Sequence, residues 1–121
     1  MKDNPPAANP PDVSLLEFEG RWRVAHTRPR QEKALEWDLL RCGGQYFLPM
    51  YEATRRSRHR RWKSVLPLFT GYVFLCGGEQ QRLRALETNR IANLIDVPDQ
   101  AGFVSELAGI QQMLASGLAV D

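Results

Sequence analysis

Short stretches with a two-residue hydrophobic period alternate along this chain with longer stretches in which apolar residues recur every three to four positions. Residues 21–27 alternate polar with larger apolar side chains, which predicts a half-buried strand with Trp22 and Val24 facing the core. Residues 31–41 are rich in strong helix formers, and Pro29 suits the first turn of a helix. The buried stripe of this helix is expected to consist of Leu35, Leu39 and Cys42.

The middle of the chain predicts three strand segments. The two glycines at 43–44 are expected to end the first helix. Residues 45–54 predict a strand, in which Pro49 indicates an edge position or a bulge. Residues 62–69 and 71–76 predict two more strands. The second of these is almost wholly apolar, as is typical of a central strand.

The last third of the chain predicts helix, strand and helix. Residues 80–87 can form a short helix, with Leu83 and Leu86 expected to face inward. Residues 91–97 predict a strand, and Asp99 is suited to be the N-cap of the final helix. The apolar stripe of that helix is expected to consist of Phe103, Leu107, Ile110, Leu114 and Leu118.

The predicted order of elements is therefore β-α-β-β-α-β followed by a terminal helix. This order is typical of an α+β, ferredoxin-like fold, an antiparallel sheet with helices packed on it and here an extra C-terminal helix. Residues 1–18 are expected to form a flexible, proline-rich tail, because such a stretch buries too little apolar surface to order itself. Residues 19–121 are expected to form one domain.

Composition excludes several classes of protein. The chain lacks a run of eighteen apolar residues and an apolar signal region at its start, so we expect a cytoplasmic protein without a membrane role. Cys42 and Cys76 match neither a zinc-ligand nor a redox spacing, and two reduced, buried thiols are expected. Nothing indicates an oligomer, and we expect a monomer.

Catalytic and cofactor motifs are not found in the sequence. His26 lies at a predicted strand end and His59 within a basic run, and neither has a partner at a spacing typical of a dyad or a metal site. Motifs of hydrolases, zinc proteases and phosphate-binding loops are absent. We therefore expect no enzyme, no catalytic residue, no metal and no cofactor.

A local basic run stands out against a net charge of only +2. Arginine pairs with phosphate in a bidentate manner, and Trp62 within the run could stack on an exposed base. The alternative is a solvated hairpin tip that keeps a strand edge from pairing. Six of the sixteen Lys and Arg residues lie within positions 55–63, namely Arg55, Arg56, Arg58, Arg60, Arg61 and Lys63.

A second candidate site is the aromatic segment 67–74. Strand alternation places Tyr72 and Phe74 on one face, and Phe69 precedes the bend at Gly71. These aromatics can all belong to the core, or some can line an exposed apolar patch for a partner helix. Composition leaves both interpretations open.

Four ordered stretches resemble the NusG family of transcription factors. They read WRVAHTRPRQEK at 22–33, YFLPM at 46–50, PLFTGYVF at 67–74 and TNRI at 88–91. The third resembles the family's PLFPGYvFv signature and is the most specific of the four. The spelling is more similar to specialised paralogues of the RfaH or UpxY kind than to housekeeping NusG.

The resemblance implies an N-terminal NusG domain that binds the clamp helices of the largest bacterial RNA polymerase subunit and modulates pausing and processivity. It implies contact with non-template or upstream DNA as well. The resemblance places the clamp-helix contact at Phe69, Tyr72, Phe74 and Leu68. It places a second polymerase contact at Arg82 and Arg84. The nucleic-acid contacts that it implies are Arg28, Arg30, Gln31 and Arg90, to which we add Arg58, Arg60 and Arg61 of the basic run.

Two departures from the family pattern matter. Thr70 stands where the family usually has proline. The family's β-barrel KOW domain is not found in these 121 residues, and contacts with ribosome or termination factor are expected only through such a domain. The alternative functions are a free-standing nucleic-acid-binding module that uses residues 55–63 and a purely structural protein-interaction domain.

Overall fold

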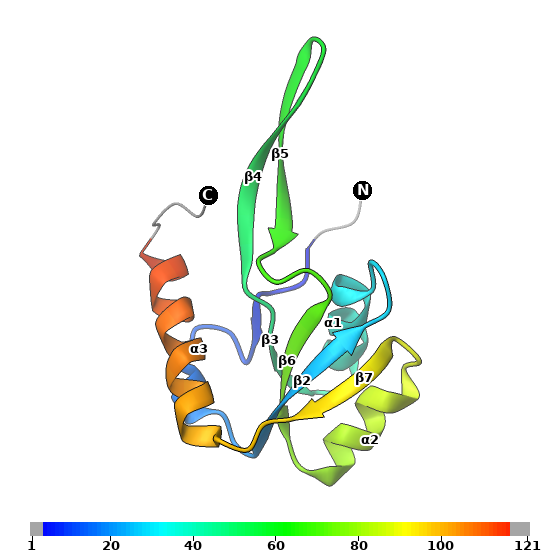
Figure 1. Ribbon diagram of the computed structural model, residues 1–121, viewed down its shortest axis with the longest axis vertical. Coiled ribbons are helices and arrows are strands. Elements are labelled where there is room, and N and C mark those ends of the chain that lie inside the picture. The colour runs from blue at the N-terminus through cyan, green and yellow to red at the C-terminus, as the bar shows by residue number, and fades with distance from the viewer. Residues whose placement is uncertain (1–3, 117–121) are drawn as a thin grey trace.

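The computed structural model describes residues 4–116 (Figure 1). From residue 21 onward its elements follow the predicted order, except that the predicted strand 45–54 is divided in two. The elements are β1 (Ala8–Asn9), a 3-10 turn η1 (Leu15–Glu17), β2 (Arg21–Thr27), α1 (Glu32–Arg41), β3 (Gln45–Phe47), β4 (Met50–Ser57), β5 (Arg60–Pro67), β6 (Tyr72–Gly77), α2 (Glu79–Glu87), β7 (Ile91–Asp96) and α3 (Gln100–Ala115).

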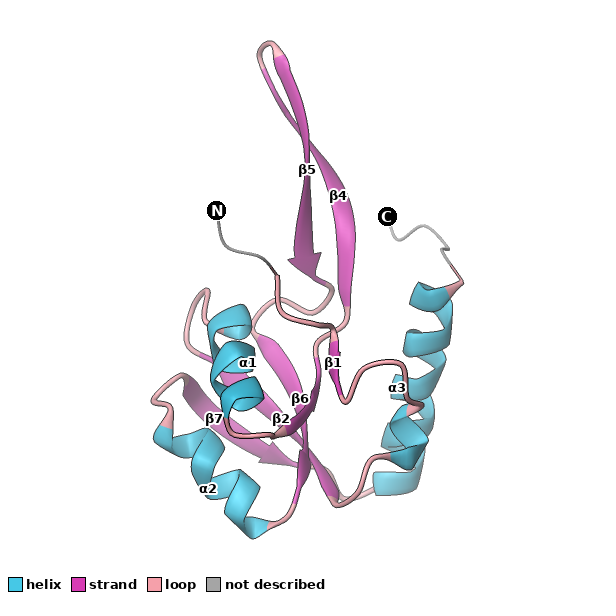
Figure 2. Cartoon of the chain, turned by 180° about the vertical axis from the view of Figure 1, so that it is seen from behind, coloured by secondary structure: helices cyan, strands magenta, loops and turns pink. Residues whose placement is uncertain are grey.

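The main sheet has the strand order β1-β3-β6-β2-β7, and all of its pairings are antiparallel. Without the short β1, the order β3-β6-β2-β7 is that of a split βαβ fold, with the first and third core strands in the centre. Helices α1 and α2 lie on one face of the sheet and α3 lies on the other (Figures 1 and 2). The α+β, ferredoxin-like prediction with an extra C-terminal helix is confirmed.

Each face of the sheet carries its own core cluster, because successive strand residues point to opposite sides. On the α1 and α2 face, Leu35 and Leu39 of α1 pack on Ala25 and Val73. On the α3 face, the buried residues are Ala8, Leu15, Phe18, Trp22, Phe47, Phe74, Cys76 and Leu107. The predicted inward position of Trp22 is confirmed, and its ring stacks on Phe18 at 5.5 Å between centroids.

Helix ends follow the predicted capping chemistry. Gly43 adopts φ +74°, and the amides of Gly43 and Gly44 donate to the carbonyls of Leu40 (3.3 Å) and Leu39 (2.8 Å). These two bonds close α1 as a Schellman motif, which needs a residue with positive φ at the first position after the cap. The Asp99 carboxylate accepts from the Gly102 amide at 3.0 Å and caps α3. The predicted stripe position Leu118 lies outside the described residues.

The predicted strand 45–54 is in fact two strands in two different sheets. β3 ends at Phe47, and the buried pair Leu48 and Pro49 carries the chain out of the main sheet. The Leu48 amide donates to Ala7 at 2.7 Å, while Pro49 has no N–H for a ladder. β4 then pairs with β5 in a separate two-stranded sheet that projects far from the body (Figure 1).

The expectation of a flexible tail over 1–18 is wrong for residues 4–18. β1 pairs with β3, and the Tyr46 hydroxyl donates to the Pro6 carbonyl at 2.8 Å. Leu15 is fully buried, and Gln111 of α3 holds this turn by accepting from the Leu15 amide at 3.2 Å. The segment is poor in apolar residues, but those it has enter a core made by other elements.

Three smaller expectations also differ from the structure. Leu83 and Leu86 are 47% and 37% exposed, because α2 turns its small residue Ala85 to the sheet and so lies close against it. Cys42 is exposed, since it is the cap residue beyond the last turn of α1. Pro29 lies in the turn before α1 rather than in its first helical turn.

Candidate macromolecule-binding surface

The 67–74 segment crosses from the hairpin to the central strand β6 through a tightly held turn. Gly71 adopts φ +88°, a conformation that favours glycine. Its carbonyl accepts from the Thr27 amide and its amide donates to Glu32 Oε2, both at 2.8 Å. The Leu68 amide donates to the Pro49 carbonyl at 2.8 Å. The turn is therefore fixed from three sides, with threonine in place of the family's usual proline at position 70.

The three aromatics of this segment divide into two exposed rings and one core ring. Phe69 and Tyr72 are 40% and 37% exposed, whereas Phe74 is only 8% exposed. Phe74 lies edge-on to Phe103 of α3, with centroids 5.6 Å apart, and edge-on to Phe69 at 5.8 Å. The core interpretation therefore holds for Phe74, while Phe69 and Tyr72 form an exposed apolar patch above it.

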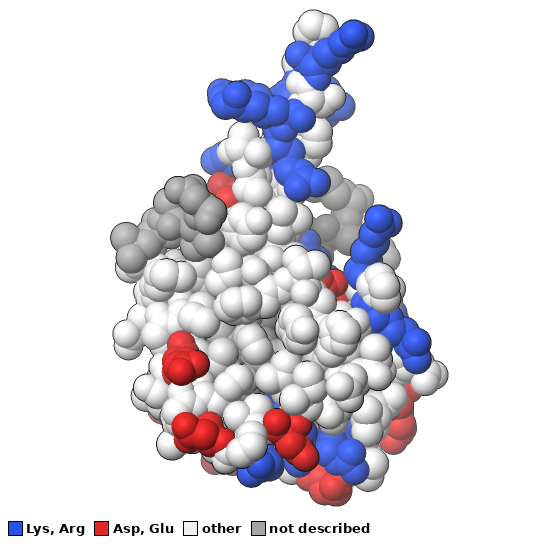
Figure 3. All heavy atoms as spheres, in the orientation of Figure 1, with Lys and Arg blue, Asp and Glu red and all other residues white. Residues whose placement is uncertain are grey.

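The exposed patch continues across the sheet toward the edge strand β7. The His26 ring stacks on Tyr72 with centroids 5.0 Å apart. Val24 pairs with Phe74 on one side and with Ile95 on the other, so these side chains share the α3 face. Ile95 is 38% exposed. The middle of this face is largely free of charged side chains (Figure 3).

His26 and Ile95 are not singled out by the sequence pattern as members of a binding surface. The signal for His26 is its position two and four residues after Val24 and Trp22, which puts all three on one face. The signal for Ile95 is weaker, because β7 carries apolar residues on both faces and strand pairing decides which of them α3 covers. We define the apolar patch as Phe69, Tyr72, His26 and Ile95.

Glu32 is the residue that positions the turn under this patch. Its side chain is buried, at 6% exposure, and its only hydrogen bond within the described chain is the one from the Gly71 amide. A carboxylate that accepts a buried amide bond fixes the backbone more strongly than a neutral acceptor does. The first turn of α1 therefore fixes the backbone next to Tyr72 through the hydrogen bond between Glu32 and the Gly71 amide.

Replacing Glu32 by alanine is expected to destabilise the domain by about 1.5–3 kcal/mol, because the partly buried Gly71 amide loses its charged acceptor. Glu32→Gln keeps an acceptor oxygen and should recover a large part of this loss. Urea unfolding of both variants measures the difference, with Glu87→Ala at the exposed end of α2 as the control. Equal losses in the alanine and glutamine variants would contradict the positioning role.

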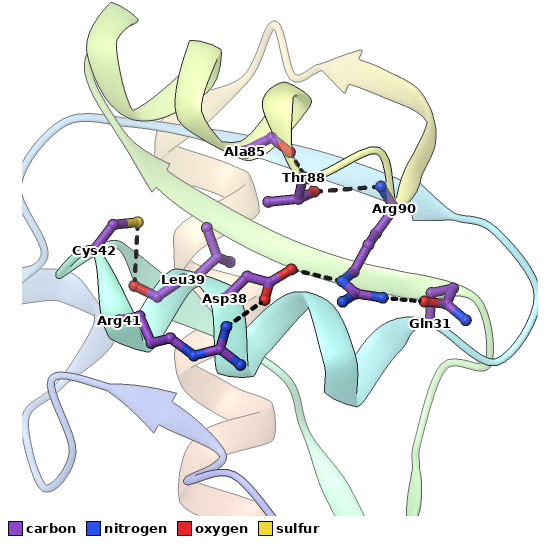
Figure 4. Close-up of polar contacts among 8 residues, drawn as sticks. All are labelled: Gln31, Asp38, Leu39, Arg41, Cys42, Ala85, Thr88 and Arg90. Atoms are coloured by element: carbon purple, nitrogen blue, oxygen red, sulfur yellow. Dashed lines mark hydrogen bonds and ion pairs between the residues drawn. The ribbon is translucent and has the colours of Figure 1, made fainter.

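The residues for which the resemblance implies nucleic-acid contact meet at the junction of α1 and the turn before β7. Arg90 Nε pairs with Asp38 Oδ2, and Arg90 Nη1 donates to Gln31 Oε1, each at 2.5 Å (Figure 4). The Arg28 amide donates to the Arg90 carbonyl at 2.8 Å. Arg90 and Gln31 thus join two elements, and Arg28 and its neighbour Arg30 remain exposed beside them.

Asp38 lies at the centre of this polar cluster and was not expected from the motif. It accepts from Arg41 at 3.0 Å as well as from Arg90 (Figure 4). The single Asp38 charge offsets only one of the two arginine charges, so this cluster keeps a net charge of +1 and Arg28 and Arg30 add to it. A carboxylate at i+7 from Gln31 lies on the same helix face, and that spacing is the sequence signal for it.

The structure does not bring Arg82 and Arg84 together as one contact. They are two positions apart on α2 and so point to different sides of the helix. Arg82 is half-buried and pairs with Glu79 in the preceding turn, while Arg84 is exposed. A partner can contact the exposed Arg84 directly, whereas a partner that contacts Arg82 also meets the paired Glu79 carboxylate.

The basic residues of the hairpin form the second exposed site. Arg58, Arg60 and Arg61 lie at its tip, and the side chains of the whole run 55–63 are exposed. Figure 3 shows these positive charges gathered on the projecting arm, well separated from the acidic residues of the body. A flexible partner strand can therefore contact the outer part of the arm without approaching an acidic side chain, while Glu52 lies nearer the base and pairs with Lys63.

Two buried groups outside the apolar patch are chemically unusual. Glu36 of α1 is fully buried and neither carboxyl oxygen has a hydrogen-bond partner in the described chain. Burial raises the pKa of Glu36 to about 10, and the nearby Tyr46 hydroxyl lowers this pKa by a smaller amount. Burial also raises the pKa of the Cys76 thiol to about 11, which keeps it protonated and unreactive.

Residues 4–116 contain no group of three or more His, Cys, Asp or Glu side chains placed to hold a metal ion. None of the helices within that range has the length and apolar character needed to cross a membrane.

Comparison with known proteins agrees with the fold and the motifs. The family model described as transcription termination factor nusG matches residues 20–113. A search of curated proteins finds no match. The matched range begins at the residue before β2, ends within α3 and includes the 67–74 segment, the basic hairpin and the Arg90 junction. Since this range covers most of the chain, the protein belongs to the NusG family of transcription elongation and termination factors.

Proposed function

We propose that this domain binds RNA polymerase by placing its apolar patch against the clamp helices of the largest subunit, and that it thereby modulates pausing and processivity. The observation that carries the proposal is the exposure of Phe69 and Tyr72 on a turn that is fixed from three sides. Membership of a transcription-factor family supports a partner within the transcription machinery.

The physics of the patch suits a helical partner. Phe69 lies edge-on to Phe74, and Tyr72 shares a face of β6 with Phe74, so a partner helix can contact both exposed rings on one apolar surface. Leu68 is half-buried at the edge of the same turn. A few aromatic anchors surrounded by neutral contacts supply most of the affinity in such interfaces. A preformed turn also lowers the ordering cost of binding.

Calorimetry with the isolated clamp-helix hairpin tests the proposal. Tyr72→Ala is expected to weaken binding by about 2 kcal/mol or more, roughly 30-fold, because an aromatic anchor is lost. Leu16→Ala is the matched control, since Leu16 is 64% exposed on the 3-10 turn η1, outside the patch. Absence of binding by the unaltered protein, or full binding by Tyr72→Ala, would refute the docking surface.

A second candidate function is nucleic-acid binding by the basic hairpin. The specific observation is that Arg56 lies directly opposite Arg61, a like-charge pair that costs stability and gains from a polyanion. Non-template or upstream DNA would be the ligand within a transcription complex, with Arg28 and Arg30 as further contacts. Negligible affinity for nucleic acid near physiological salt would leave the hairpin at most an accessory contact of the polymerase-bound factor.

A further inference from the structure

The basic hairpin has two faces of different chemistry. β4 and β5 pair with Arg55 opposite Trp62, Arg56 opposite Arg61 and Ser57 opposite Arg60. Directly opposed residues point to the same side of an antiparallel pair, and the side alternates at each step. The Trp62 face therefore carries Arg55, Ser57, Arg60 and Trp62, and the arginine face carries Thr54, Arg56, Arg61 and Lys63.

Trp62 has no core to enter. The outer part of the hairpin is a two-stranded sheet that stands away from the body, and no helix covers either of its faces there (Figures 1 and 2). The Trp62 side chain is accordingly 43% exposed. Its one ring contact of note is with the Arg60 guanidinium, which lies 5.9 Å from the ring centroid. The guanidinium lies over one face of the indole, so a stacking partner would use the opposite face.

The charge around Trp62 is almost unopposed. Within β4, β5 and their connecting turn, Glu52 is the single acidic residue, and it pairs with Lys63 near the base of the hairpin at 3.3 Å. The arginines closer to the tip have no acidic neighbour on the hairpin. A binding partner that neutralises them must therefore bring several negative charges.

We infer that the Trp62 face binds a single-stranded nucleic acid, with an unpaired base stacked on the Trp62 ring and the neighbouring phosphates on Arg55 and Arg60. Duplex DNA exposes phosphates and base edges but hides the flat faces of its bases, whereas every unpaired base offers a flat face for stacking. The inference rests on the proposed nucleic-acid role of the hairpin and specifies its ligand. It is independent of the clamp-helix contact.

Fluorescence anisotropy with the full chain tests the inference, using labelled single-stranded DNA, single-stranded RNA and duplex DNA of matched sequence at low salt. Trp62→Leu is expected to weaken binding to single strands about tenfold and to change duplex binding less than twofold, because loss of a stacking partner affects only unpaired bases. Trp62→Phe keeps a ring and should retain most of the affinity. Tryptophan emission should be quenched by single strands in the unaltered protein but not in Trp62→Phe.

Arg55→Ala is the matched control, because Arg55 lies directly opposite Trp62 on the same face. It should weaken single-strand and duplex binding alike and reduce the salt slope by about one. Equal losses on both ligands for Trp62→Leu, or no loss, would overturn the inference and make Trp62 a support of the hairpin alone. Failure of the unaltered protein to bind any strand would also overturn the inference. The clamp-helix calorimetry would still test the docking surface independently.

Discussion

Replacing Phe74 by alanine is expected to destabilise the domain by about 3–5 kcal/mol, the range for a buried aromatic whose removal leaves a cavity. Phe74 is 8% exposed and lies between Phe103 of α3, Phe47 of β3 and Phe69, with centroids 5.6, 6.3 and 5.8 Å away. It joins the central strand to the C-terminal helix. Urea unfolding followed by circular dichroism measures the loss.

Tyr72→Ala is the control for this prediction, two residues away on the same face. It should cost less than about 1 kcal/mol of stability, because its ring is partly exposed and its main neighbour is the exposed His26. Similar unfolding midpoints for the two variants would show that Phe74 is not the core residue of the pair. A loss of partner binding in Phe74→Ala must therefore be compared at conditions where the variant is folded.

Local sequence patterns were sufficient to predict the core of the fold. Polar-apolar alternation places β2 at Arg21–Thr27 with Trp22 buried, and the glycine pair after Cys42 marks the end of α1. Such signals work because they depend on neighbours within a few positions. The ferredoxin-like order then follows from short connections between elements.

The parts that could not be predicted depend on contacts between distant residues. Leu15 and Ala8 are buried only because α3 and β3 lie beside them, and no local pattern encodes that. The break after Phe47 needs knowledge of where Leu48 and Pro49 sit in the core. Tertiary packing also decides the orientation of α2, for which helical spacing allows more than one inward face.

The candidate site was predictable as a segment but not as a set of roles. The motif at 67–74 marks the docking turn, yet only packing against α3 separates the core ring Phe74 from the exposed Tyr72. Glu32 and Glu36 illustrate the same limit on one helix. A glutamate in a helix is expected at the surface, and here Glu32 holds the Gly71 amide while Glu36 is enclosed without a hydrogen bond in the described chain.

The enclosed carboxyl of Glu36 should make the domain lose stability as pH rises through neutrality. Burial raises the pKa of Glu36 from its ordinary 4.5 to about 10, so the folded state favours the protonated acid. Its stabilising contribution is complete below pH 4.5 and is lost as pH rises toward 10, at about 1.4 kcal/mol per pH unit. Between pH 4.5 and pH 7 the loss is on the order of 3 kcal/mol.

Glu36→Gln should therefore stabilise the domain at pH 7 by up to about 3 kcal/mol and flatten the dependence of its unfolding free energy on pH between 5 and 8. The neighbouring Tyr46 does not obscure this range, because burial and the Glu36 charge both raise the pKa of its hydroxyl. Urea unfolding at half-unit pH steps measures both effects, with Glu17→Gln at the exposed turn η1 as the control. A stability that is constant or rises from pH 5 to 8, together with no gain in Glu36→Gln, would show that the carboxyl reaches water. In that case residues 4–9 would open readily and let water reach Glu36. This segment holds the Tyr46 hydroxyl, which lies beside Glu36, through the Pro6 carbonyl.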